Sequence, residues 1–351
     1  MKYFALSCIY LALCGFLNPF DKDVLYPPFL KGKSPWADSV FASLTPDERI
    51  GQLFMVAAFS NQDQQHVKEI TELIQVQKIG GLIFFQGGPV RQALLTNNYQ
   101  CISKVPLMIA MDAEWGLGMR IDSAMSFPYQ MALGAMQNNK LIYEMGFMIA
   151  KQCKRLGVHI NLAPVVDINN NPNNPVINQR SFGENKENVA LKGIAYMNGM
   201  QNNGVLANAK HFPGHGDTDT DSHLALPVIS HSKERLDSME LYPFKKLIQQ
   251  GLGSVMAAHL YLTAYENEPN TASTLSKSII TGLLKDSLGF KGLVFTDALI
   301  MKGVSDYFEP GILEVKALLA GNDVLLYPKD VPKAIEEIKK AIESGQITQE
   351  E

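Results

Sequence analysis

Gly292-Leu-Val-Phe-Thr-Asp297 is a short apolar run that ends in a carboxylate. A run of this length and composition is typical of a buried strand. Asp is depleted within strands, so its position at the end of one calls for an explanation. The same arrangement recurs in Pro106-Leu-Met-Ile-Ala-Met-Asp112. The sequence therefore predicts two buried strands that each end in Asp, and these two carboxylates are candidates for a functional site.

Apolar runs of this kind recur along the chain and indicate its architecture. Eight of them begin near Met55, Gly80, Pro106, Val158, Val205, Ser254, Gly292 and Asp323. Helical stretches are predicted between them, at 136–155, 185–202, 233–250 and 330–343. Eight alternating strand–helix units over roughly 300 residues favour an α/β fold, a (β/α)8 TIM-type barrel with some irregularity in the early strands. A doubly wound open sheet is the alternative, but no Gly-x-Gly-x-x-Gly or phosphate loop follows a run, so nucleotide binding is unsupported.

Two of the helical stretches carry recognisable ends. Thr45-Pro-Asp-Glu48 has the form of a capping box, with proline at the first helical position. Gly251 follows the 233–250 stretch, and glycine there is typical of a helix that ends in a left-handed conformation. Both signals place helix ends independently of the apolar pattern.

The densest group of reactive side chains is Lys210-His-Phe-Pro-Gly-His-Gly-Asp-Thr-Asp-Thr-Asp-Ser-His223. Its alternating Asp residues resemble the start of a calcium loop, but Ser222 and Val228 stand where that loop needs Gly and Glu. A zinc site made by the three histidines and a plain polar turn are the other non-catalytic interpretations. His, Asp and Lys packed this closely favour acid–base chemistry over both.

A proton-transferring pair is predicted within this loop. Asp221 and His223 are two residues apart in a turn, so the carboxylate can orient the imidazole. A His can release a proton and take it back near pH 7. Asp297 is the candidate nucleophile, and its structural alternative is a helix N-cap. A carboxylate and such a pair facing one pocket would fit a double-displacement glycosidase.

A barrel would bring these groups together, because its active site lies at the C-terminal ends of the strands. Six polar residues fall at or near such ends: Asp112, Asp167, Lys210, His211, His259 and Asp297. The loop with Asp221 and His223 follows the fifth predicted strand, and Asp297 follows the seventh.

At these residues the sequence resembles glycoside hydrolase family 3, in the bacterial exo-β-N-acetylglucosaminidase branch that uses an Asp–His dyad. Four motifs occur in the family's order: Met111-Asp-Ala-Glu-Trp-Gly-Leu-Gly-Met-Arg120, Asn161-Leu-Ala-Pro-Val-Val-Asp167 with Gln179-Arg-Ser-Phe-Gly183, the Lys210–His223 loop, and Phe295-Thr-Asp-Ala-Leu-Ile-Met301. The resemblance covers about residues 40–345, and the loop is its most specific part.

The resemblance implies a role for each matching residue. Asp297 would be the nucleophile, His223 the general acid/base, and Asp221 the residue that orients His223. The terminal sugar would be bound by Asp112, Arg120, Arg180, Lys210 and His211. No step would require a cofactor or a metal ion.

Supporting residues are also expected in the pocket. Glu114, Asp167 and His215 match the family pattern and are assigned to positions behind the sugar-binding side chains. The three cations of the sugar-binding set could indicate an anionic ligand. Pairing of these cations with Asp112, Glu114 and Asp297 is the preferred interpretation.

The implied substrate is a non-reducing terminal β-linked N-acetylglucosamine, carried on peptidoglycan fragments. Three other functions stay open. One is a phosphorylase, because a His acid/base does not repel phosphate. Another is a β-glucosidase or β-xylosidase, against which the dyad loop argues. The last is a non-catalytic sugar-binding module, which would have lost its nucleophile or its dyad.

Composition sets the outer bounds. The 351 residues are 46% apolar with a net charge of −4, which suits one large core and gives no reason to expect nucleic acid. An apolar run at 3–17 follows Lys2 and is short for a membrane span. Residues 1–17 are therefore predicted to be a signal peptide or lipoprotein signal, 18–38 a tether, and 39–351 the barrel domain, with its C-terminal end truncated relative to the family.

Export follows from that leader. The protein is expected in the periplasm or anchored to the cell envelope as a lipoprotein, and the lipid would be its only contact with a membrane. Its expected partner is a carbohydrate, and the sequence leaves the oligomeric state open.

Overall fold

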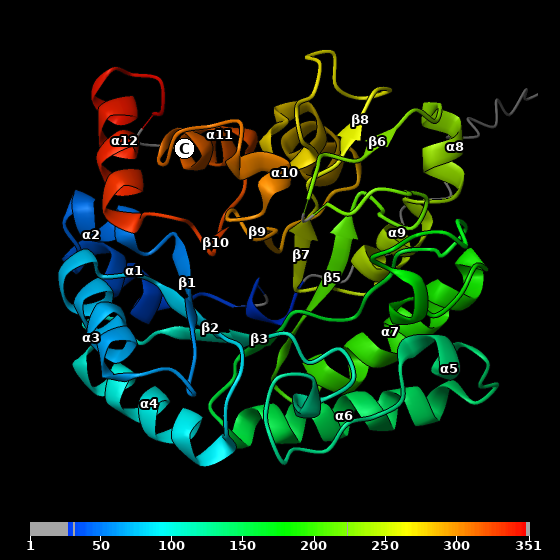
Figure 1. The fold of residues 1–351 in the computed structure, drawn as a ribbon, viewed down its shortest axis with the longest axis horizontal. Coiled ribbons are helices and arrows are strands. Elements are labelled where there is room, and N and C mark those ends of the chain that lie inside the picture. Colours follow the sequence, from blue (N-terminus) through cyan, green and yellow to red (C-terminus); the bar gives the residue numbers. More distant parts are fainter. Residues whose placement is uncertain (1–26, 31, 223, 349–351) are drawn as a thin grey trace, which may run out of the picture.

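The computed structural model describes residues 27–30, 32–222 and 224–348. At its centre eight parallel strands form a ring, with helices around the outside (Figure 1). The strands are β1 (Phe54–Ala58), β2 (Gly81–Phe84), β3 (Met108–Met111), β4 (Ile160–Asn161), β5 (Leu206–Phe212), β7 (Ser254–Ala257), β9 (Leu293–Thr296) and β10 (Leu325–Leu326). Their order in the sheet is β10-β1-β2-β3-β4-β5-β7-β9. All eight predicted strand positions are confirmed.

The ring closes between β9 and β10. Val324, just before β10, forms a parallel bridge with Phe295 of β9. The backbone N–H of Thr296 donates to the carbonyl of Val324 at 3.0 Å. These bonds join the two edges that an open sheet would leave unpaired. The predicted (β/α)8 barrel is therefore confirmed, and the doubly wound alternative is wrong.

The irregular strand is β5 rather than an early one. β1, β2 and β3 pair in unbroken register. The pairing of β5 with β7 shifts between Ala209 and Phe212, at the strand end that carries Lys210 and His211. Bulges next to active sites re-aim side chains, which accounts for an irregularity at this position.

Alternation along the strands divides the apolar side chains between two cores. In β1, Met55 and Ala57 belong to the inner core, whereas Phe54, Val56 and Ala58 pack in the layer shared with the helices. The inner core consists of Met55, Ala57, Ile83, Ala110, Ile160, Leu162, Met256, Phe295 and Leu326. These side chains fill the barrel, so a ligand site can form only above the core, at one end of the strands.

Helices cover the outer face of the barrel (Figure 1). They are α1 (Pro35–Ser43), α2 (Pro46–Gly51), α3 (Gln64–Glu72), α4 (Pro89–Ile102), α5 (Gln130–Gly134), α6 (Asn139–Arg155), α7 (Lys186–Gln201), α8 (Lys233–Ser238), α9 (Tyr242–Gln249), α10 (Lys302–Ser305), α11 (Ile312–Ala320) and α12 (Val331–Glu343). A further helical segment, η6 (Ser278–Ser287), precedes β9. The predicted stretches 136–155, 185–202 and 330–343 correspond to α6, α7 and α12.

The prediction of one helix over 233–250 is wrong. The chain leaves the helical conformation at Met239 and starts again at Tyr242, so the stretch forms α8 and α9. Pro243 lies in the first turn of α9, where its missing N–H has no cost, but it cannot continue a helix from before. Gly251 after α9 has φ +81°, which confirms the predicted left-handed end.

The capping box at the start of α2 is also confirmed. The backbone N–H of Glu48 donates to Thr45 Oγ1 at 3.3 Å, and the N–H of Thr45 donates to Glu48 Oε2 at 2.9 Å. Each side chain satisfies a backbone donor that the helix itself leaves without an acceptor.

The predicted leader, residues 1–17, lies outside the described residues, as does part of the predicted tether. Residues 35–38 of that tether already belong to α1. Within the described ranges, no helix has both the length and the apolar character needed to span a membrane.

Beside the barrel, β6 (Val228–Ile229) and β8 (Tyr261–Leu262) form a small parallel sheet.

Candidate active site

The C-terminal ends of the strands surround a cavity of about 440 Å³, a volume suited to a small ligand. Six of the predicted site residues line it: Asp112, Arg120, Arg180, Lys210, His211 and Asp297. They come from the ends of β3, β5 and β9 and from the loops after β3 and β4. Because all strands of the barrel point the same way, these distant segments meet at one end of it. The structure therefore brings these six residues together around one cavity.

Asp112 lies between two cations at the end of β3. Lys210 Nζ is 2.8 Å from its Oδ1, and Arg120 Nη2 is 2.6 Å from its Oδ2. Burial raises the pKa of Asp112, but the charges of Lys210 and Arg120 outweigh burial and bring the pKa below its ordinary value. Asp112 is therefore a carboxylate that can accept hydrogen bonds from ligand hydroxyls.

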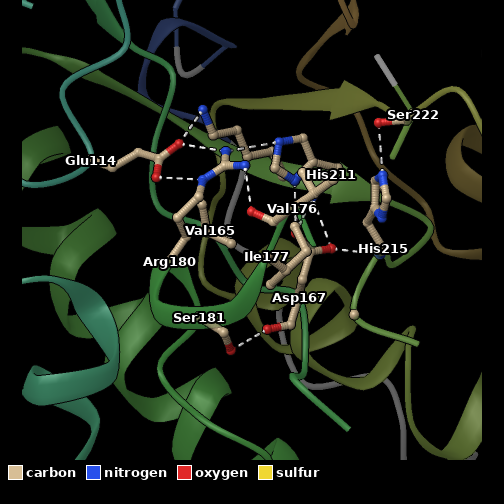
Figure 2. Close-up of polar contacts among 12 residues, drawn as sticks. Glu114, Val165, Asp167, Val176, Ile177, Arg180, Ser181, His211, His215 and Ser222 are labelled. Atoms are coloured by element: carbon tan, nitrogen blue, oxygen red, sulfur yellow. Dashed lines mark hydrogen bonds and ion pairs between the residues drawn. The ribbon is translucent and has the colours of Figure 1, made fainter. Parts of the chain in front are cut away.

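Glu114 is fully buried and shares Lys210 with Asp112, and its second cation is Arg180. Figure 2 shows its contacts with Arg180. Arg180 donates to it twice, from Nε to Oε2 at 3.0 Å and from Nη2 to Oε1 at 2.7 Å. Lys210 Nζ lies 2.9 Å from Oε1. Burial alone would raise the pKa of Glu114, and the two cations lower it strongly instead. The predicted pairing of the pocket cations is confirmed for both Asp112 and Glu114, which argues against an anionic ligand.

Asp167 anchors the beginning of the loop that follows β5 (Figure 2). Its carboxylate accepts the backbone N–H of His211 at 3.1 Å and that of His215 at 2.7 Å. His211 Nδ1 lies 2.7 Å from Asp167 Oδ2, and Arg180 Nη2 lies 3.3 Å from His211 Nε2. Because a guanidinium only donates, the proton of a neutral His211 ring is assigned to Nδ1. Despite burial, the nearby histidines lower the pKa of Asp167.

Asp297 is the first residue after β9 and is half-buried. Its backbone N–H donates to the carbonyl of Ala257 at 2.9 Å, and its Oδ1 accepts the N–H of Ala298 at 2.8 Å. The next helix, α10, begins only at Lys302, so the helix N-cap alternative is wrong. In the ring, β9 and β3 are separated by β10, β1 and β2 on one side and by β7, β5 and β4 on the other. Asp297 therefore faces Asp112 from the opposite side of the barrel.

The predicted proton-transferring pair is described only in part. Asp221 is half-buried, and its carbonyl accepts the backbone N–H groups of Leu224 at 3.0 Å and Ala225 at 3.1 Å. Ser222, the next residue, is buried and lines the cavity. His223 lies outside the described residues, so its position beside Asp221 stays a prediction.

The aromatic part of the cavity wall escaped sequence analysis. Phe85 and Tyr327 both line the cavity, and their ring centroids are 5.7 Å apart. Arg120 stacks over Phe85 at 4.8 Å. Tyr327 has φ +48°, an uncommon conformation for a residue other than glycine. Phe59, Phe85 and Tyr327 each follow a strand directly, and this repeated position is the signal that could have revealed them.

His259 was expected near the site from its position after β7. Its Nδ1 lies 2.7 Å from Thr274 Oγ1, and its Nε2 lies 3.2 Å from the carbonyl of Ala298. It is fully buried, so it supports the backbone next to Asp297 from behind.

One group near the loop has the composition of a metal site. Donor atoms of Asp217, His231 and Glu240 lie within 4.8 Å of one another. Arg235 Nη2, however, is 3.2 Å from Glu240 and 3.6 Å from Asp217, and His231 Nε2 is 2.7 Å from Asp217. Because Arg235 already pairs with both carboxylates and His231 contacts Asp217, the group is best described as an ion-pair network.

His215 gives the fold a pH dependence that can be measured. Burial of the ring, together with the charge of His211, lowers the pKa of His215 to about 4. An unfolded chain takes up this proton near pH 6.5, so the unfolded state binds more protons between pH 6.5 and about 4. The stabilising contribution is complete above pH 6.5. It is lost as the pH falls through that window, at about 1.4 kcal/mol per pH unit.

We therefore expect the unfolding free energy to fall between pH 6.5 and 5, with His215 contributing about 2 kcal/mol of the loss. Urea denaturation of the wild type and of His215→Asn at both pH values measures this contribution. His66 and His159 also have lowered pKa values, so only the difference between the two proteins isolates His215. An equal decline in both proteins would contradict the assignment.

Comparison with known proteins shows which family the chain resembles. The model of the family described as "Glycosyl hydrolase family 3 N terminal domain" matches residues 45–351. The chain is 36% identical over 315 residues to "Beta-hexosaminidase A" of Pseudoalteromonas piscicida, covering 81% of this chain and 53% of that protein. It is 32% identical over 281 residues to a "Beta-hexosaminidase" of Nitrosomonas eutropha, covering 76% of this chain and 80% of that protein.

A solved structure is also similar along most of the chain. It is a "glycoside hydrolase family 3 beta-N-acetylglucosaminidase from Paenibacillus sp. str. FPU-7", with a TM-score of 0.82 and 39% identity over 88% of this chain and 60% of that one. The chain thus spans only about half to two thirds of the length of some relatives. The family match nevertheless includes the whole barrel and every described residue of the cavity wall, and this chain therefore belongs to glycoside hydrolase family 3.

Proposed function

We propose that this protein is a retaining exo-β-N-acetylglucosaminidase that releases terminal N-acetylglucosamine from the non-reducing end of its substrate. The observation that carries the proposal is that Asp297 lies across one cavity from Asp112 and the cations that pair with it. A carboxylate on one side and hydroxyl-binding groups on the other suit a sugar ring held between them. The names of the relatives in Pseudoalteromonas and Paenibacillus support the same substrate class.

The proposed reaction has two displacements. Asp297 attacks the anomeric carbon, and a bond to its carboxylate oxygen forms while the bond to the leaving oxygen breaks. His223, as an imidazolium that the anionic Asp221 stabilises, gives that oxygen a proton and becomes neutral. In the second step, water attacks the same carbon, His223 removes the proton from water, and Asp297 is released as a carboxylate.

The charged side of the cavity, which is formed by Asp112 and the cations around it, supports exo action on a terminal sugar. Asp112 and Lys210 can bind hydroxyls of the sugar in concert with Arg120, Arg180 and His211 around them. Lys210 is 2% exposed and Glu114 behind it is fully buried, so the wall is closed on that side. When the hydroxyls of a sugar bind to these side chains, the cavity leaves no space for another sugar unit on that side.

Preference for the acetamido sugar is the expected result that tests this function. We expect kcat/KM for an aryl β-N-acetylglucosaminide to exceed that for the matching aryl β-glucoside by at least ~10-fold. Equal rates or a preference for the glucoside would favour a β-glucosidase. Binding of the sugar without turnover of either substrate would indicate a non-catalytic module.

Phosphorolysis is the second candidate, since the proposed acid/base is a His, which does not repel phosphate as a carboxylate would. The same assay with and without inorganic phosphate separates the two reactions. A hydrolase releases free N-acetylglucosamine at a rate that phosphate leaves unchanged. A rate that rises with phosphate, with a sugar phosphate as product, would replace hydrolysis by phosphorolysis.

We also propose that the substrate is a peptidoglycan fragment and that the protein is exported through its leader. The apolar run at 3–17 after Lys2 supports export. Fractionation of the producing cells, with mass spectrometry of the mature N-terminus, tests the location. An intact N-terminus in the cytoplasmic fraction would overturn it, and failure to release N-acetylglucosamine from purified muropeptides would overturn the substrate source.

A further inference from the structure

The loop that carries the proposed dyad is closed on itself by one buried ring, that of His215. Its Nδ1 lies 2.8 Å from Thr218 Oγ1. Its Nε2 lies 2.8 Å from Ser222 Oγ, and Figure 2 shows this second contact. All three side chains are at most 3% exposed. We call these two contacts the His215 bridge. They connect the beginning of the loop with its far end, seven residues later in the chain.

The near end of the bridge is fixed to the barrel. The backbone N–H of His215 donates to Asp167, whose carboxylate also holds His211 in the cavity wall. Asn174 Nδ2 donates to the carbonyl of His215 at 2.8 Å and lies 3.3 Å from Thr218 Oγ1. Gly216 lies so close to Ile168 that a Cβ atom there would be 1.7 Å from the Ile168 carbonyl oxygen. These contacts hold the backbone around His215 against the barrel, so the position of its ring is fixed.

The far end of the bridge lies inside the reactive part of the loop. Ser222 lines the cavity together with His215, and in the chain it stands between Asp221 and His223. The hydroxyl of Ser222 and that of Thr218 can each donate or accept, so a neutral ring is satisfied at both nitrogens with either tautomer. Burial lowers the pKa of His215 to about 4, so the ring is neutral near pH 7.

We infer that His215 and Ser222 are positioning residues, which hold the loop so that the proposed acid/base reaches the leaving-group oxygen. This inference rests on the proposed function, because it assigns the bridge a task in proton transfer. It predicts a specific kinetic effect: loss of the bridge should impair the proton-dependent step and leave sugar binding intact. An error of about 1 Å in the position of a catalytic group can cost up to ~10²-fold in rate.

Ser222→Ala is the direct test, because it removes one hydroxyl and leaves the fold of the barrel untouched. The substrates are two β-N-acetylglucosaminides, one with a dinitrophenyl leaving group and one with an alkyl leaving group that needs protonation. We expect kcat/KM, which reports the first displacement, to fall by about 10-fold for the alkyl substrate and by less than about 2-fold for the dinitrophenyl substrate, whose leaving group needs no proton. Ser222→Thr keeps the hydroxyl and should restore most of the loss.

Thr220→Ala is the matched control. Thr220 belongs to the same loop, but its hydroxyl donates to Asp219 at the surface, at 3.2 Å. Its removal should leave both rates unchanged. Equal losses for the two leaving groups in Ser222→Ala, or no loss at all, would overturn the positioning role in an enzyme that is otherwise active.

Hydrogen exchange supplies a readout that does not depend on activity. Peptides from residues 215–222 should exchange faster in Ser222→Ala than in the wild type or in Thr220→Ala, because the bridge restrains that segment. Unchanged exchange would show that the bridge does not hold the loop. If the wild type were inactive on both substrates, the proposed function would fall, and exchange would still decide whether the bridge restrains the loop.

Discussion

Asp297→Asn should abolish turnover of an aryl β-N-acetylglucosaminide, lowering kcat by about 10⁴-fold or more. The amide has the shape of the carboxylate but neither its charge nor its nucleophilicity, so no covalent intermediate can form. Asn can still accept the N–H of Ala298, the bond that now orients the side chain at 2.8 Å. The fold should therefore survive, and circular dichroism with thermal unfolding checks that it does.

Asp297→Ala with sodium azide distinguishes a nucleophile from a residue that only binds the sugar. The smaller side chain leaves room for azide beneath the anomeric carbon. Azide would form a bond to that carbon while the bond to the aryl leaving group breaks, which yields a glycosyl azide of inverted configuration. Recovery of activity with this product supports the nucleophile role. A retained configuration, or substantial activity of Asp297→Asn without azide, would assign the nucleophile elsewhere.

Glu114→Gln should be among the most destabilising conservative changes in the cavity wall. Glu114 is buried and neutralises both Arg180 and Lys210. The amide removes that charge, so Arg180 loses the carboxylate that it binds, and Lys210 keeps only Asp112, which Arg120 also binds. Loss of one partner from a buried ion pair typically costs about 3–5 kcal/mol. Urea denaturation at pH 7, where Glu114 is ionised, measures the loss.

Glu336→Gln provides the comparison for that measurement. Glu336 lies on the surface of α12 and pairs with Lys333 and Lys340 there. Water screens such pairs, so its denaturation midpoint should move little. If the two variants shifted the midpoint equally, the buried ion pairs of Glu114 would not stabilise the fold as argued. Sugar affinity should fall only in Glu114→Gln, because Arg180 and Lys210 lose the partner that orients them.

The strand positions and most of the cavity residues could be predicted because each is written in a local pattern. A short apolar run bounded by turn residues is typical of a buried strand, and the Asp after such a run falls at the strand's end. Asp112 and Asp297 were found in this way, and the parallel barrel then required them to share one end. The break between α8 and α9 was missed because the apolar pattern runs through Pro243 without interruption.

The contacts between loops could not be predicted in the same way. Glu114 binds Arg180 and Lys210, which are far from it in sequence, and no pattern within its own segment reveals either partner. Ser222 attracted notice only as the wrong residue for a calcium loop, yet its hydroxyl meets the ring of His215. Phe85 and Tyr327 resemble ordinary core residues until the closed ring brings them to the cavity.

By itself the sequence determined the strands, the type of fold and the chemical groups available, because these depend on burial and on spacing along the chain. Only the tertiary structure decided which carboxylate neutralises which cation, and which hydroxyl holds the loop. Those pairings arise when barrel closure brings loops together from different strands. Their energies come from burial and from distances of 2.6–3.3 Å between groups such as Asp112 and Arg120 or His211 and Arg180, which no local pattern encodes.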